Sequence, residues 1–138
     1  MSVKIIGVEK ELPDYSRETA DILPFVDGWL EGQDERFRRK ILKIFEGAGV
    51  DKRYSIMSPE EVFTSSSFEE KNNLYVRKVK KLGNKGLQKA LQSNGWEAGS
   101  VYFMINVSCP GIMIHSLVSY LLNELQIGKV IIRVPCTE

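Results

Sequence analysis

Three consecutive segments decide the fold class: VYFMINVS at residues 101–108, SLVSYLLNEL at 116–125 and KVIIRV at 129–134. The first is almost entirely apolar, as a central strand buried on both faces is, and the third has the same character. The second has helical character and is followed by Gly128. Strand, helix and strand with a crossover of about twenty residues predict a βαβ unit and therefore a parallel pair. The sequence thus predicts an α/β fold, with a sheet that contains a parallel βαβ unit flanked by helices.

Upstream of this unit, a helix is predicted from about Glu35 to Glu46. Its apolar residues Phe37, Ile41, Ile44 and Phe45 recur at i, i+4, i+7 and i+8, the spacing of one buried stripe. The following glycines at 47 and 49 suit a helix C-terminus. Earlier in the chain, residues 2–9 alternate like a strand, and a helix over 17–30 should be kinked or restarted at Pro24.

Two capping boxes mark further helix starts. SPEE at 58–61 places serine at the N-cap, proline at the first helical position and glutamate at the third, and SFEE at 67–70 repeats the pattern. The second box begins a long helix with an apolar side, which Asn94 and Gly95 end. Both helix starts are therefore predicted from residues three positions apart.

Composition limits the class of protein. The chain has 138 residues, a formal net charge of +1, two cysteines and one histidine. This length fits a single domain covering residues 1–138, and the balanced charge favours neither a nucleic-acid nor a membrane partner. No apolar run is long enough to span a bilayer. Two cysteines exclude a disulfide framework and, with one histidine, a Cys/His metal cluster. We expect a cytoplasmic protein with no bound metal.

One loop could carry chemistry. Residues 107–116 leave the carboxyl end of a buried strand and enter a helix, where open α/β sheets place ligands. Cys109 and His115 could form a nucleophilic pair there, because helix N-termini stabilise thiolates. They could equally be a small buried side chain and a surface residue of a tight turn. No carboxylate in the loop would orient the histidine.

A second candidate is the polar side of the 35–46 helix. Arg36, Lys40 and Lys43 fall within about 60° of one another at about 100° per residue, away from the apolar stripe. Three cations on one face can hold a polyphosphate, or they can simply be a solvated surface. The lysine-rich stretch from 77 to 89 lacks interleaved aromatic residues, so we assign it no function.

Five segments in fixed order together resemble one family. They are IFEGAGVDKRY (44–54), SFEEKNNLY (67–75), KLG (81–83), VSCPGIMI (107–114) and RVPCTE (133–138). The sequence resembles the N-terminal part of bacterial type III polyketide synthases, the chalcone and stilbene synthase family. The similarity extends over essentially all of this chain but only the first part of such an enzyme.

The resemblance implies the N-terminal part of a thiolase-like fold, a homodimer, and decarboxylative Claisen condensation of malonyl-CoA with a CoA-linked starter. In the family, a cysteine carries the acyl chain, and a histidine and an asparagine stabilise the enolate and the oxyanion. Relatives have that cysteine just after the segment matching 133–138, so Cys136 is not the nucleophile. The resemblance therefore assigns no catalytic residue to this chain, and we expect the 138-residue polypeptide alone to be inactive.

The resemblance also suggests binding residues. Lys40 and Lys43 match two basic positions that contact the phosphates of CoA, with Arg36 beside them, and Gly47 departs from the third. Cys109 matches a position lining the starter pocket. Ile114 matches one that crosses the dimer interface, and His115 replaces a proline beside it. Pro110 and Val118 are further departures at this pocket and interface. The implied partners are a CoA thioester, as substrate rather than resident cofactor, and a second copy of the chain.

Two alternatives stay open. A ketoacyl-carrier-protein synthase III-like enzyme shares the fold and the cysteine, although the 68–75 segment and the basic helix favour the polyketide synthase. The chain could also be a non-catalytic remnant that binds CoA or forms dimers.

Overall fold

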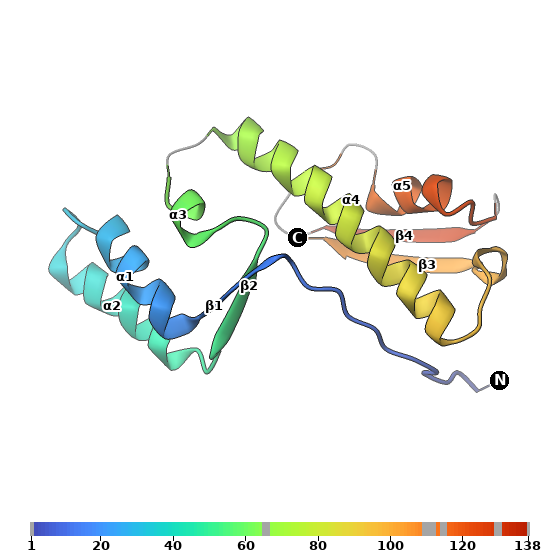
Figure 1. Cartoon of the computed structure of the whole chain (residues 1–138), viewed down its shortest axis with the longest axis horizontal. Helices are drawn as coiled ribbons and strands as arrows, with labels where there is room; N and C mark the ends of the chain where they lie inside the picture. The colour runs from blue at the N-terminus through green and yellow to red at the C-terminus, as the bar shows by residue number, and fades with distance from the viewer. Residues whose placement is uncertain (1, 65–66, 109–112, 114–115, 129–130, 138) are drawn as a thin grey trace. The chain divides into compact units, whose positions relative to one another are not determined.

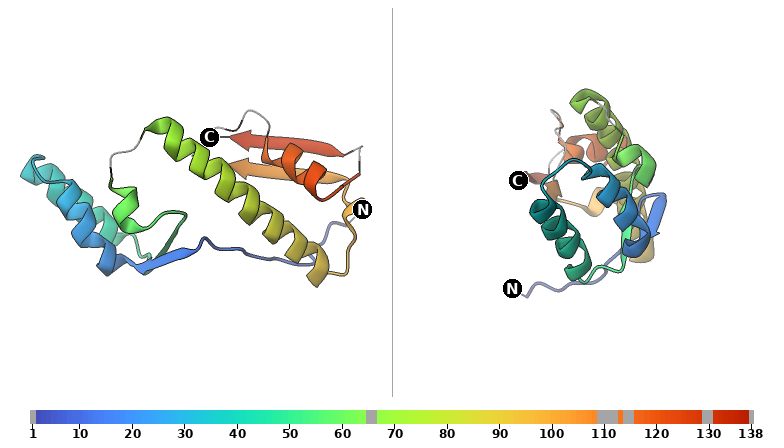
Figure 2. Two further views of the ribbon diagram at one scale, coloured as in Figure 1. Left: turned by 45° about the horizontal axis from the view of Figure 1, so that its top comes forward. Right: turned by 90° about the vertical axis from the view of Figure 1, so that its left-hand side faces the viewer.

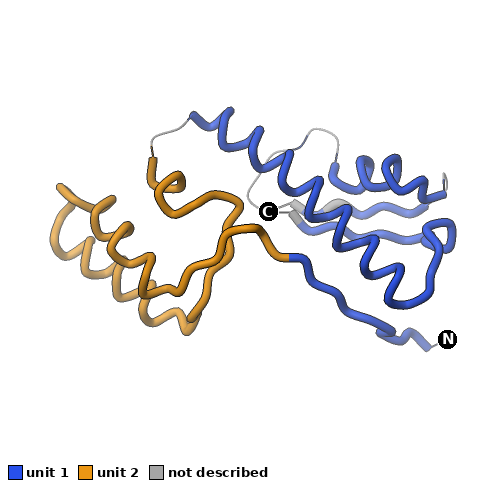
Figure 3. The backbone as a smooth tube through the Cα atoms, in the orientation of Figure 1, with its two compact units in different colours: residues 1–11, 67–138 blue, residues 12–66 orange. Residues whose placement is uncertain are grey.

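The computed structural model describes residues 2–64, 67–108, 113, 116–128 and 131–137 (Figure 1). The elements in chain order are β1 (Tyr15–Glu18), α1 (Thr19–Trp29), α2 (Glu35–Gly47), β2 (Lys52–Ser55), α3 (Pro59–Val62), α4 (Phe68–Ser93), the 3-10 turn η1 (Ala98–Ser100), β3 (Phe103–Ser108), α5 (Leu117–Glu124) and β4 (Ile132–Thr137). The chain divides into two compact units (Figure 3). One comprises residues 12–66, and the other comprises 1–11 with 67–138.

The 12–66 unit is built on an antiparallel pair, β1 with β2, in which Tyr15 lies opposite Ser55 and Glu18 opposite Lys52. Thr19, at the start of α1, links this pair to the turn after α2. Its backbone N–H donates to the carbonyl of Asp51 at 2.6 Å, and its hydroxyl donates to the carbonyl of Val50. Helices α1 and α2 lie side by side (Figure 2).

The core of this unit is small. Val26 and Leu30, from α1 and the residue after it, are buried, and Trp29 meets Phe63 with ring centroids 6.2 Å apart. The expected buried stripe on α2 is only partly covered, because Phe37 and Ile44 remain exposed while Ile41 and Phe45 are half-buried. Part of the apolar side of α2 therefore faces away from the core of its own unit.

Pro24 does not restart α1, which was one of the two outcomes expected from sequence, and a kink at this residue stays a prediction. The helix runs continuously from Thr19 to Trp29 with Pro24 inside it. A proline removes one backbone donor, and the helix around it is packed, because Val26 is buried and α2 contacts α1.

The second unit contains the predicted βαβ arrangement. β3 and β4 are parallel, with Phe103 opposite Ile132 and Val107 opposite Cys136. Helix α5 connects them and contacts β3, and α4 packs on α5 (Figures 1 and 2). The buried cluster consists of Val118, Leu122 and Ile127, against which Leu87 and Met104 pack. The prediction of an α/β fold with a parallel pair is confirmed.

Both capping boxes are present. The Ser58 hydroxyl accepts from the N–H of Glu61, whose carboxylate accepts from the N–H of Ser58 at 2.8 Å. Ser67 and Glu70 make the same reciprocal pair at the start of α4. Helix α4 ends as predicted, with Asn94 as C-cap and Gly95 at φ +65°. These helix starts and stops follow directly from local sequence.

One strand prediction is wrong, and a second is right about the strand but wrong about its burial on both faces. Residues 2–9 form no strand, and Val3, Ile5 and Val8 are exposed, because alternation creates a strand only where another strand accepts its hydrogen bonds. β3 is covered on one face only. Met104 packs toward the buried cluster, whereas Phe103, Ile105 and Val107 point to the other face and are exposed.

None of the helices in the described part of the chain combines the length and apolar character that crossing a bilayer requires.

Candidate functional site

The candidate site lies on α2, whose start is fixed by Asp34. The Asp34 carboxylate accepts hydrogen bonds from the backbone N–H groups of Arg36 and Phe37, both at 3.0 Å. An aspartate at this position satisfies free amides of the first turn and is favoured by the helix dipole. The cap therefore sets where the helix begins and, with it, which residues share its polar face.

Two cations of α2 are held by carboxylates. Arg38 makes a two-pronged contact with Asp27 of α1, its Nε and Nη2 donating at 2.6 and 2.5 Å. The hydrogen bond from Arg38 lowers the pKa of the Asp27 carboxyl, and Asp27 raises the pKa of Arg38 in turn. Arg39 pairs with Glu35 one turn earlier at 3.4 Å. Arg38 therefore joins two helices, whereas the ion pair of Arg39 found among the described residues lies within its own helix.

The three cations singled out from sequence behave differently. Arg36, Lys40 and Lys43 are exposed, and within the described residues no carboxylate lies within ion-pair distance of them. They line a shallow, open hollow on the surface of α2 with Arg39, Leu42 and Glu46. The structure thus places the predicted three on one face with Glu46 beside them, and none of the three forms an ion pair within the described residues. We refer to Arg36, Lys40 and Lys43 as the basic face.

The basic face suits a ligand that carries several negative oxygens. Lysines act as compact point charges and arginine offers a planar fork of donors, so together they can contact separate phosphates. The hollow is open rather than enclosed, so each contact is screened by water and salt. Such a surface can hold a polyphosphate but supplies no group for covalent catalysis.

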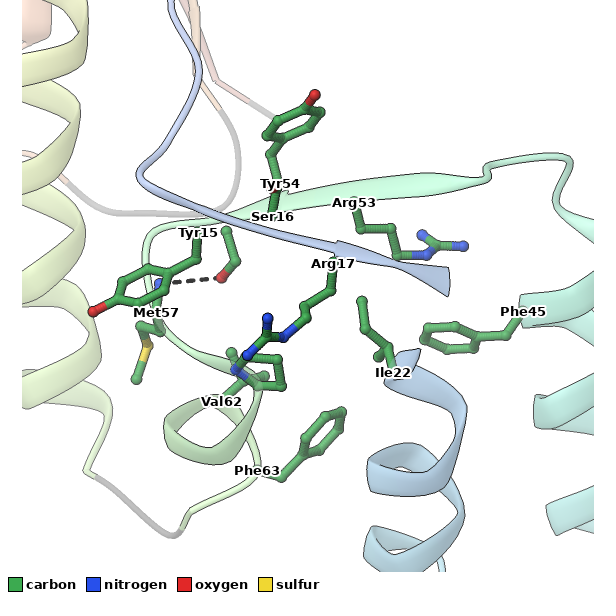
Figure 4. A pocket seen from close by; sticks show the side chains of 12 residues that line it. Tyr15, Ser16, Arg17, Ile22, Phe45, Arg53, Tyr54, Met57, Val62 and Phe63 are labelled. Atoms are coloured by element: carbon green, nitrogen blue, oxygen red, sulfur yellow. Dashed lines mark hydrogen bonds between the residues drawn. The ribbon is translucent and has the colours of Figure 1, made fainter. Parts of the chain in front are cut away.

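A separate pocket of about 250 Å³ lies in the same unit (Figure 4). Its apolar walls come from α1, α2 and the segment from β2 through α3, and they include Ile22, Phe45, Met57, Val62 and Phe63. Two arginines, Arg17 of β1 and Arg53 of β2, also line it. Sequence reasoning missed this pocket, because its two charged residues lie far apart in the chain and meet only through the register of β1 with β2.

The other predicted site residues cannot be placed. Cys109, Ile114 and His115 lie outside the described residues, as does Pro110, so their roles at a starter pocket or dimer interface stay predictions. Cys136 is an exposed free cysteine on β4.

Comparisons with known proteins were made for sequence and for fold. No family model matches the sequence. The 1,3,6,8-tetrahydroxynaphthalene synthase of Streptomyces coelicolor is 29% identical over 97 residues, and the match covers 70% of this chain. The phloroglucinol synthase of Pseudomonas fluorescens is 21% identical over 89 residues, or 64% of this chain.

Solved structures point the same way. The crystal structure of the Streptomyces coelicolor synthase, a bacterial type III polyketide synthase, matches 94% of this chain with a TM-score of 0.83 and 24% identity. The homologues of this chain are type III polyketide synthases. CsyB complexed with CoA-SH matches the fold over 99% of this chain, with a TM-score of 0.82 and 22% identity. The resemblance inferred from the five ordered segments is therefore confirmed.

The matched region is only part of each relative. The chain spans 26% of the length of both curated relatives and 37% of both solved structures. Its fold is accordingly a part of the thiolase-like fold of type III polyketide synthases.

Proposed function

We propose that this chain is the CoA-binding N-terminal part of a type III polyketide synthase-like acyltransferase. In this proposal the whole protein condenses malonyl-CoA with a CoA-linked starter, and the basic face of α2 contacts the CoA phosphates. The observation that carries it is the cluster of Arg36, Lys40 and Lys43 on one face without carboxylate partners among the described residues.

Charge placement on α2 supports this assignment. A helix surface built only for solubility commonly pairs its cations with acids one turn away, as Arg39 does with Glu35. The basic face instead gathers three like charges within about 60°, which costs repulsion that an anionic ligand relieves. The relative CsyB was crystallised with CoA-SH, and its fold matches this chain almost end to end.

The test is binding of CoA by the 138-residue chain, followed by NMR titration at low salt. Each exposed charge contact contributes about 1 kcal/mol or less, so we expect a dissociation constant of about 1 mM. Shifts should concentrate on α2 and weaken as salt is added. The double variant Lys40→Ala and Lys43→Ala should lose the binding.

A matched control removes two charges elsewhere. Arg77 and Lys81 are exposed on α4 in the other unit, so the double variant Arg77→Ala and Lys81→Ala changes net charge by the same amount. It should bind CoA as the parent does. Equal losses from both double variants would show that the attraction is general charge and that the basic face is only a solvated surface. Lys80 is unsuitable as a control, because its ammonium lies 4.7 Å from the centre of the Tyr120 ring.

We further propose that the 138-residue polypeptide by itself does not condense malonyl-CoA. Covalent catalysis needs an activated nucleophile and donors for the oxyanion, and the resemblance assigns neither Cys109 nor Cys136 to that role. Labelled malonyl-CoA with several starter thioesters should give no polyketide. Turnover that Cys109→Ala abolishes and Cys136→Ala leaves intact would overturn this proposal and restore the Cys109/His115 pair.

The similar proteins help to choose between this proposal and the two alternatives that the sequence leaves open. The sequence match to the Streptomyces coelicolor tetrahydroxynaphthalene synthase, a bacterial type III polyketide synthase, favours such a synthase over a ketoacyl-carrier-protein synthase. A non-catalytic CoA-binding or dimer-forming module is compatible with the basic face. An activity assay in which the rest of a type III synthase is supplied separates that module from an enzyme part, because only the enzyme part should then gain activity.

A further inference from the structure

We propose that the pocket of the 12–66 unit binds a small monocarboxylate with an aromatic or aliphatic body, its carboxylate held between Arg17 and Arg53. This site is separate from the basic face. Phe45 lines the pocket. At about 100° per residue, it lies about 140° around α2 from Lys40 and about 200° from Lys43, which is the other side of the helix.

The first argument is the register of the antiparallel pair. Arg17 of β1 lies directly opposite Arg53 of β2, and both side chains line the pocket. Residues directly opposite on neighbouring strands share one face, and like charges in that arrangement destabilise the pair. Figure 4 shows Arg17 pointing toward Val62 and Arg53 toward Phe45, with the pocket between them. An anion at this position would turn the repulsion into attraction.

The second argument is an unsatisfied donor. The Nε of Arg53 is buried and has no hydrogen-bond acceptor among the described residues. The guanidinium stacks on the Phe45 ring, 4.8 Å from its centre, which fixes its plane. A buried donor of a charged group is costly to leave unpaired, so Arg53 gains from a rearrangement that gives its Nε an oxygen acceptor.

The charged groups near Arg17 and Arg53 do not neutralise the two arginines. Glu60 lies near Arg17, and the pKa of its carboxyl is lowered first by hydrogen bonds from its own backbone amide and from Ser58, and less by the charge of Arg17. Within the described residues, neither arginine has a carboxylate at ion-pair distance. Glu60 therefore balances one charge at a distance, and the pair remains net positive.

The walls and volume of the pocket determine the polarity and size of the part of the ligand beyond its carboxylate. Most of the pocket wall is apolar and includes Ile22, Phe45, Val62 and Phe63. A bare inorganic anion would leave most of this pocket unfilled. A volume of about 250 Å³ is below that of pockets for drug-sized ligands, about 300 to 1,000 Å³. A carboxylate on one aromatic ring or a short chain satisfies the arginines at one end and the apolar walls at the other.

The test compares benzoate with benzamide, which has the same shape without the charge. Binding to the 138-residue chain is followed through the methyl resonances of Ile22, Met57 and Val62. We expect saturable shifts with benzoate, and binding of benzamide weaker by about tenfold or more, the ratio that a hydrogen-bonded charge commonly gives. Arg17→Gln and Arg53→Gln should each weaken benzoate binding by a similar factor.

Two variants serve as controls. Arg39→Gln removes an exposed arginine of the same unit whose ion pair, in the part of the chain that the structure describes, is with Glu35, and it should bind benzoate unchanged. Lys40→Ala with Lys43→Ala should also leave it unchanged, which separates this site from CoA binding. If Arg53→Gln does not fold, the proposal is still tested by Arg17→Gln and by the comparison of benzoate with benzamide binding to the parent chain. Equal binding of both probes, no saturable shift, or an equal loss in Arg39→Gln would overturn the proposal.

Discussion

At the scale of single residues, the contact between Asp27 and Arg38 is the clearest link between α1 and α2. Nε and Nη2 of Arg38 each donate to a different carboxylate oxygen of Asp27. Such bidentate pairs are stronger and more directional than single ion contacts. Both side chains are about one-third exposed, so solvent screens the pair and its contribution to stability is modest. The pair is therefore easier to detect in the pH dependence of stability than in the stability at one pH.

Replacing Asp27 by asparagine should flatten the acid limb of the stability curve. The pKa of Asp27 is lower in the folded chain than its ordinary value of 3.8, so its contribution is complete above that value. The contribution is lost as the pH falls through the lower, folded-state pKa. We expect Asp27→Asn to lower Tm at neutral pH and to lose less Tm than the parent on acidification. Thermal unfolding followed by circular dichroism measures both.

Glu35→Gln provides the comparison for this prediction. Glu35 pairs with Arg39 on the exposed side of α2, and both side chains are mostly in solvent. Its replacement should leave the shape of the curve close to that of the parent. An acid limb that Asp27→Asn leaves unchanged would show that the pair does not link folding to protonation.

At the scale of elements, the long helix α4 carries two glycines in different surroundings. A Cβ added at Gly83 would lie 3.3 Å from Leu117 Cδ2 and 3.5 Å from Leu121 Cδ1, so this glycine lets α5 approach closely. At Gly86 the nearest atom would be Glu11 Cβ at 3.7 Å, an ordinary contact. The helix interior disfavours glycine at both positions, but only Gly83 has a packing reason to be there.

We therefore expect Gly86→Ala to stabilise the chain by up to about 1 kcal/mol, the difference in helix propensity. Gly83→Val should destabilise it, because the branched side chain must displace Leu117 and add volume to a packed contact. Urea unfolding of both variants and of the parent measures the free energy of unfolding. A gain at Gly83→Val equal to that at Gly86→Ala would mean that α4 and α5 do not pack closely at this point.

At the scale of the whole molecule, the main feature is an uncovered apolar sheet face in the unit that contains β3 and β4. Phe103, Ile105 and Val107 of β3 are exposed, and Ile132 and Val134 are their exposed partners on β4. Because residues two apart on a strand share a face and the register aligns them, these side chains form one continuous surface. Exposed apolar surfaces of this kind promote association.

The 138-residue polypeptide should therefore self-associate. Sedimentation velocity should show a mass above that of the monomer at micromolar concentrations and a shift with dilution. Ile105→Lys places a charge in the middle of the face without entering the buried cluster, and it should shift the equilibrium toward monomer. Lys71→Glu, on the exposed start of α4, is the control and should not. A monomeric parent chain at high concentration would contradict this prediction.

Local features could be predicted from the sequence because their causes lie within a few residues. Ser58 with Glu61 and Ser67 with Glu70 set two helix starts through contacts three residues apart. Asn94 and Gly95 end α4 for an equally local reason. The basic face follows from helical periodicity alone, and the five ordered segments identified the family of the homologues. The parallel pairing of β3 with β4 followed from the length of the crossover.

Only the tertiary structure decided the features that depend on contacts between distant segments. Apolar composition predicted that β3 is a strand, but only the position of α5 determined that Met104 is covered and Ile105 is not. Residues 2–9 alternate correctly, yet no strand among the described segments pairs with them. Arg17 and Arg53 became a candidate site only through the register of β1 with β2. Strand pairing and side-chain burial are non-local, since each requires a partner that periodicity within one segment does not specify.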